Sequence, residues 1–88
     1  MELYKEITKT FTAIEAAFPK EELLIFRDTP IGDLCLYHFS LGVWIRNNLI
    51  QQKESILYEL FNENHIEHPD DMSHIIIMLF HQYITYKI

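Results

Sequence analysis

The sequence is poor in the residues that interrupt or cross-link a chain. It has one cysteine, two glycines and three prolines in 88 residues. A lone cysteine cannot form an intramolecular disulfide, which excludes a disulfide-stabilised secreted scaffold and favours a reducing cytoplasm. Because Cys35 lies between Leu34 and Leu36, we expect a buried and unreactive thiol. With so few glycines the chain also lacks loops that cradle phosphates, and we expect no cofactor.

Basic residues and long apolar runs are also scarce. Seven lysines and arginines stand against thirteen aspartates and glutamates, which gives a formal charge of -6 with neutral histidines. This balance disfavours direct contact with nucleic acid or anionic lipid and suits a basic protein partner. The longest apolar run, 75–80, is far shorter than the roughly 20 residues of a membrane-spanning helix, and no signal peptide is recognisable. We therefore expect a cytoplasmic protein with no membrane or nucleic-acid role.

Apolar residues, in contrast, are plentiful. They make up 49% of the chain and include six phenylalanines, five tyrosines and one tryptophan. A composition this apolar is typical of folded domains and not of disordered segments. A chain of this length buries roughly 60–70% of its unfolded surface, which is enough for one core. Since no repeat, linker or low-complexity tract divides the sequence, we expect a single domain over residues 1–88.

The apolar residues recur at helical spacing and predict an all-α fold, a compact bundle of about five helices. Pro19, Pro30 and Pro69 each stand at the start of a helical segment, where a proline is best tolerated. The predicted helical segments cover residues 2–18, 19–27, 30–50, 53–63 and 69–86. We expect the bundle to pack around the last helix and the helix that carries a buried Trp44.

The last predicted helix begins with HPDDMSH, a stretch rich in acids and histidines. On a helix, Asp70, His74 and His81 fall within about 40° of one another, opposite the predicted core face. Two histidines seven residues apart lie about 10 Å apart along the axis, too far to hold one metal ion, and we expect no metal site. One of Asp70 and Asp71 is expected to cap the helix, where its charge faces the positive end of the helix dipole.

The same side of this helix also carries two apolar residues, Ile77 and Ile84. Either other helices enclose the segment on two sides, or these isoleucines form an exposed strip that contacts a partner. The exposed strip would support a protein-binding function.

A second unusual residue is Arg46, within the segment LGVWIRNN (41–48). On a helix, it shares a face with the apolar residues Phe39, Val43 and Ile50. A buried charge without a partner costs several kcal/mol, so we expect an acid to pair with Arg46. Asp70 and Asp71 at the start of the last helix are the preferred partners, and the pair would join the two helical regions.

Two blocks of the chain, YHFSLGVWIRNN (37–48) and HIEHPDDMSHII (65–76), resemble a bacterial family of uncharacterised domains. Members carry a His-Phe-x-Leu-Gly-x-Trp-Ile-Arg-Asn block and, downstream, a His-Pro-Asp-Asp-Met-Ser block. The resemblance covers roughly residues 20–84. It implies that the two blocks meet in space, and it adds Asn47 and His68 to the residues of interest, but it implies no activity. By association alone, the resemblance implies a setting near mobile elements and toxin or defence genes.

Two functions of different class fit these residues. The first is a small, acidic, non-catalytic protein-binding module, of the immunity or anti-defence inhibitor type, which the missing catalytic motifs favour. The alternative is a small ligand-binding or enzymatic domain centred on Arg46, Asp70, Asp71 and nearby histidines. A pocket with Arg46 exposed inside it would favour the alternative. The candidate binding residues are Arg46, Asn47, His68, Asp70, Asp71, His74, Ile77, His81 and Ile84.

Overall fold

The structure is a computed structural model that describes residues 2–51 and 55–87. Over this part of the chain it is helical and contains no strand, so the predicted all-α class is confirmed. Residues 2–51 and 55–87 form six α-helices, where about five helices were predicted. The elements are α1 (Glu2–Lys9), α2 (Phe11–Ala17), α3 (Lys20–Arg27), the 3-10 helix η1 (Ile31–Tyr37), α4 (Leu41–Ile45), the π-helix η2 (Arg46–Ile50), α5 (Ile56–Glu63) and α6 (Pro69–Lys87).

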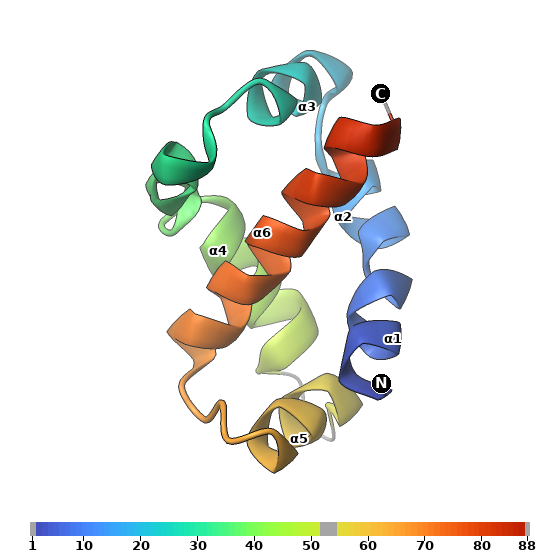
Figure 1. Cartoon of the computed structure of the whole chain (residues 1–88), viewed down its shortest axis with the longest axis vertical. Coiled ribbons are helices and arrows are strands. Elements are labelled where there is room, and N and C mark those ends of the chain that lie inside the picture. The colour runs from blue at the N-terminus through green and yellow to red at the C-terminus, as the bar shows by residue number, and fades with distance from the viewer. Residues whose placement is uncertain (1, 52–54, 88) are drawn as a thin grey trace.

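The longest helix, α6, organises the bundle. Figure 1 shows it running across the molecule, with α4 behind it and α3 and α5 at opposite ends. It packs against α3, η1, α4 and η2. Its buried residues are Met72, Ser73, Ile76, Ile77, Phe80, His81 and Ile84. This set covers more than one narrow stripe, because other elements enclose α6 on more than one side.

Of the two arrangements considered for Ile77 and Ile84, the structure shows the enclosed one and not the exposed strip. Ile77 is 1% exposed, Ile84 is 0% exposed and His81 is 8% exposed. Tyr86, which falls on the same helical face as the buried Met72, is nevertheless 84% exposed. The physical reason is that an isoleucine gains more from full burial than a tyrosine, whose hydroxyl needs water or a hydrogen-bond partner. The core face of α6 is therefore rotated from the predicted one.

The predicted helix over residues 2–18 is divided into α1 and α2 at Thr10. The Thr10 hydroxyl donates to the carbonyl oxygen of Ile7 at 2.6 Å, and the Thr10 N–H donates to the same oxygen at 3.0 Å. A threonine that bonds back to the preceding turn bends a helix. The apolar stripe nevertheless continues across the break, since Ile7 and Phe11 are both buried.

The predicted helix over residues 30–50 is also divided, into η1, α4 and η2. In η2 the N–H of Gln51 donates to the carbonyl oxygen of Arg46 at 2.7 Å, the wide turn of a π-helix. This turn lets Ile45 and Ile50, five residues apart, both reach the core, where each is at most 1% exposed. Phe39 lies in the turn before α4 and is 86% exposed, so it does not share a buried face with Arg46.

Two predicted core residues lie closer to the surface than expected. Cys35 is exposed, because the short helix η1 buries only Leu34. Trp44 is partly exposed and packs against the edge of the core rather than inside it. The apolar neighbours of Cys35 did not predict its exposure, because the division of residues 30–50 into η1, α4 and η2 changes which side chains face inward.

α5 begins and ends with local hydrogen bonds. Residues 53 and 54 of the predicted segment lie outside the described residues, and the Ser55 hydroxyl caps α5 by accepting from the N–H of Tyr58 at 3.1 Å. At the other end, the N–H groups of His65 and Ile66 donate to carbonyls of the last turn at 3.0 and 2.9 Å. His65 has φ of 66°, a left-handed conformation that glycine adopts at less cost.

The end of α6 is tied to α2 by a charged contact. Lys87 donates from Nζ to the Glu15 carboxylate at 2.8 Å and to the Tyr83 hydroxyl at 3.2 Å. The hydrogen bond with Glu15, followed by the one with Tyr83, raises the pKa of Lys87 above its usual 10.5. This contact therefore holds the last turn of α6 against the N-terminal half of the domain.

Candidate functional site

Arg46 joins the two sequence blocks, as the family resemblance implied. Its side chain is 11% exposed and crosses from η2 to α6. Nη1 donates to the Ser73 hydroxyl at 2.9 Å, and Nη2 donates to the His38 carbonyl oxygen at 3.1 Å. Nε lies 3.6 Å from a carboxylate oxygen of Asp70. The expectation that an acid pairs with Arg46 is confirmed, and that acid is Asp70.

Gly42 makes room for this arginine. A Cβ atom at position 42 would lie 2.9 Å from Nη1 of Arg46 and 3.4 Å from the carbonyl oxygen of Tyr37. The first of these distances is too short for unbonded atoms, so a larger residue would push the guanidinium away from Ser73. The glycine therefore leaves the space that the guanidinium occupies beside Ser73.

Asp70 lies among three groups that carry or can acquire positive charge. Besides Arg46, an imidazole nitrogen of His38 and one of His68 each lie 3.9 Å from its carboxylate. Nδ1 of His68 also accepts a hydrogen bond from the N–H of Asp70 at 3.1 Å. The expected aspartate cap is therefore wrong: the imidazole of His68 caps α6, because the Asp70 carboxylate is directed toward Arg46.

Three other predicted polar residues, Asp71, His74 and His81, do not join this cluster. Asp71 and His74 are exposed, and neither side chain makes a hydrogen bond or ion pair with another described residue. Asn47 is exposed on η2. His81 is buried further along α6, where its Nε2 lies 3.1 Å from the carbonyl oxygen of Arg27. The shared polar face expected on the last helix is therefore not one site.

The arginine cluster is closed rather than open to a ligand. Each nitrogen of the Arg46 guanidinium faces a protein oxygen. The Ser73 hydroxyl in turn donates a hydrogen bond to the Asp70 carbonyl oxygen at 3.0 Å. Three hollows of the structure, described below, are lined by other residues. Chemically, the arrangement can cross-link η2, α6 and the turn that follows η1, and Arg46 lines none of these three hollows.

A surface that the sequence analysis missed lies along the outer side of α6. Two neighbouring hollows of about 420 and 430 Å³ share Leu79, Gln82 and Tyr86 in their linings. We call this region the α6 surface and define it by Tyr4, Ile31, Met78, Leu79, Gln82 and Tyr86. No aspartate, glutamate, lysine or arginine lines either hollow, although such residues make up 23% of the chain. Tyr86 could have indicated this surface from the sequence, because it is an aromatic residue with a polar hydroxyl near the end of an apolar helix.

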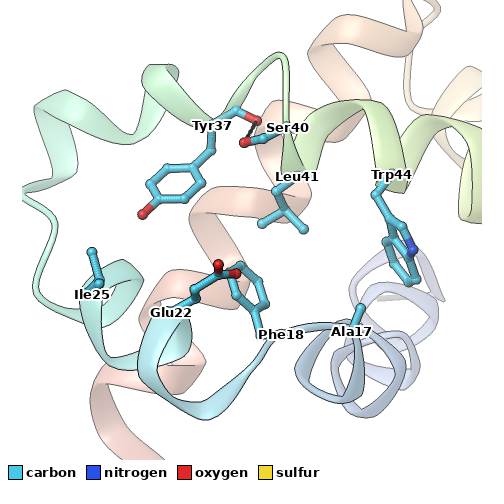
Figure 2. A pocket seen from close by; sticks show the side chains of 8 residues that line it. All are labelled: Ala17, Phe18, Glu22, Ile25, Tyr37, Ser40, Leu41 and Trp44. Carbon is cyan, nitrogen blue, oxygen red and sulfur yellow. Dashed lines mark hydrogen bonds between the residues drawn. The ribbon is translucent and has the colours of Figure 1, made fainter.

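A third hollow, of about 320 Å³, lies between the α2–α3 connection and the η1–α4 connection. Figure 2 shows its lining, with the carboxylate of Glu22 in the midst of the other side chains. Three aromatic residues contribute to it, Phe18, Tyr37 and Trp44. We call this hollow the aromatic cleft. Glu22 is the one charged residue among its eight lining residues.

Comparison with known families decides what kind of domain carries these surfaces. The family model of a domain of unknown function, DUF6794, matches residues 5–84. The chain belongs to this family. The DUF6794 match contains the arginine cluster, the aromatic cleft and most of the α6 surface. The searches of curated proteins and of solved structures found no match. Since the family description carries no activity, the function of this DUF6794 domain has to be argued from its surfaces.

Neither a metal-binding cluster nor a membrane-spanning helix is found in the part of the chain that the structure describes. No group of three or more His, Cys, Asp or Glu side chains there could hold a metal ion. None of the helices described there has the length and apolar character needed to cross a membrane.

Proposed function

We propose that this DUF6794 domain is a non-catalytic protein-binding module and that its partner binds on the α6 surface. The observation that carries the proposal is an uncharged, hollowed area with exposed Tyr4, Ile31, Met78 and Tyr86. The centres of protein interfaces are depleted in charge and enriched in aromatic residues and methionine. Contiguous exposed apolar areas on small proteins are also typical of interaction sites.

The charge of the domain indicates the kind of partner. A formal charge of -6 favours a basic protein, because opposite charges speed the encounter of two surfaces and disfavour wrong partners. An inhibitor of the immunity or anti-defence type would act by covering a functional surface of that protein. Such a role requires a binding surface and no catalytic group. The Arg46 cluster supports it, because the guanidinium already contacts Ser73, His38 and Asp70.

The alternative function, ligand binding or catalysis centred on Arg46, has less support. Asp70 is half exposed, but the arginine beside it already contacts Ser73, His38 and Asp70 itself. An arginine that clamps an anionic ligand needs free donors directed into a pocket. We therefore treat this cluster as the joint between η2 and α6.

The proposed function is tested by a pair of tyrosine variants. Tyr86→Ser removes an exposed ring from the α6 surface, and Tyr58→Ser removes a partly exposed ring from α5, outside the three hollows. The tagged wild-type domain identifies a partner from the cells that produce it, and affinities are then measured with both purified proteins. Tyr86→Ser should weaken binding about 30-fold, the effect of losing a hot-spot tyrosine, and Tyr58→Ser should leave it unchanged.

A result of equal affinity for wild type and Tyr86→Ser would overturn the placement of the partner on the α6 surface. Circular dichroism of both variants shows that the fold is intact, since each ring is accessible to solvent in the free domain.

A further inference from the structure

The aromatic cleft differs from the α6 surface in its chemistry. Among the three hollows described above, it alone has a charged residue, Glu22, in its lining. It shares no lining residue with the other two hollows, so it forms a separate place on the domain. Faces of aromatic rings are negative, and a carboxylate beside them adds to the same potential. The cleft therefore favours a cation.

The Glu22 carboxylate forms no ion pair with a lysine, arginine or histidine among the described residues. No hydrogen bond or ion pair joins its side chain to another described residue. By comparison, Glu6 pairs with Lys9, and Glu15 pairs with Lys87. Glu22 lies in the first turn of α3. A cation that enters the cleft would therefore meet a carboxylate without an ion-pair partner among the described residues.

We propose that the aromatic cleft binds an arginine side chain of the protein partner. A guanidinium is flat and weakly hydrated, stacks on aromatic rings, and pairs with a carboxylate through two parallel hydrogen bonds. The ammonium of lysine is more strongly hydrated and cannot stack, so arginine fits this lining better. The formal charge of -6 would draw such a partner toward the domain.

This inference rests on the proposed function, because it takes the partner to be a basic protein, but it can be tested without that partner. The probe is N-acetylarginine amide, titrated into the purified domain. Trp44 is the one tryptophan of the chain and lines the cleft, so its indole N–H signal in NMR spectra reports binding without assignment of other residues. N-acetylcitrulline amide has nearly the same shape without the charge and serves as the control compound.

The arginine compound should shift the Trp44 signal with a saturable, weak affinity, and citrulline should bind at least about fivefold more weakly. Glu22→Gln should lower the affinity for the arginine compound about fivefold. The matched control is Glu21→Gln, which neutralises the neighbouring exposed acid in the same helical turn but outside the cleft lining. This control should bind as wild type does.

Equal binding of citrulline, an equal loss in both glutamate variants, or no saturable shift at Trp44 would overturn the inference. None of these results tests whether the partner binds on the α6 surface. If Tyr86→Ser still loses the partner while the arginine compound fails to bind, the cleft inference fails and the proposed function stands. If the arginine compound binds through Glu22 while Tyr86→Ser keeps the partner, the placement on the α6 surface fails instead.

Discussion

Replacing Gly42 with alanine should destabilise the domain, although alanine is the better helix former. The added methyl group would lie 2.9 Å from Nη1 of Arg46, so the guanidinium must move away from Ser73. Alanine in place of glycine contributes up to about 1 kcal/mol to a helix. Loss of a hydrogen bond from a charged donor costs about 1.5–3 kcal/mol. The difference predicts a net destabilisation of about 0.5–2 kcal/mol for Gly42→Ala.

The decisive measurement is a double-mutant cycle with Arg46→Met, in which the side chain ends before the position of Nη1. In that background, Gly42→Ala has no hydrogen bond to disrupt and should stabilise the domain by up to about 1 kcal/mol. Urea denaturation followed by circular dichroism gives the free energies of unfolding of all four proteins. A stabilising effect of Gly42→Ala in the wild-type background would refute the reasoning, since the arginine would then not need the glycine.

Three further predictions concern other contacts. His65→Gly should stabilise the domain by about 1 kcal/mol, since glycine adopts the left-handed conformation more cheaply; a lower urea midpoint would contradict this. Arg46→Met and Asp70→Asn should show coupling of about 0.5–3 kcal/mol in their free energies of unfolding, whereas additive effects would argue against the pair. The raised pKa of Lys87 means that its contact stabilises fully below pH 10.5 and is lost as pH rises past that pKa. Glu15→Gln should lower this pKa in an NMR titration, and an unchanged value would exclude the contact.

The fold class and most helical segments could be predicted because helical periodicity and proline positions are local signals. The last helix was expected over residues 69–86 and covers Pro69–Lys87. The break at Thr10 could not be predicted, since a threonine inside a helix leaves the apolar spacing unchanged. The turn between η1 and α4 and the π-turn of η2 could not be predicted either, since no proline or glycine pattern marks them. Helix boundaries of this kind depend on how the segments pack together.

The candidate site also has features that the sequence could predict and features that it could not. The pairing of Arg46 with Asp70 followed from the cost of burying a lone charge, a rule that holds whatever the tertiary structure. The positions of Ile77 and Tyr86 depend on which neighbours cover α6, and periodicity cannot rank an isoleucine against a tyrosine on adjacent faces. The aromatic cleft combines residues from separate elements, so no local sequence pattern could predict it.

The central place of α6 has a consequence for synthesis of the domain. Four of the elements that precede it, α3, η1, α4 and η2, pack against α6, which is the last of the described elements in the chain. A nascent chain that ends before residue 69 therefore lacks the surface on which α3, η1 and α4 pack. Such a chain exposes its apolar faces on the ribosome until α6 emerges, and during that interval it is open to chaperones and to aggregation.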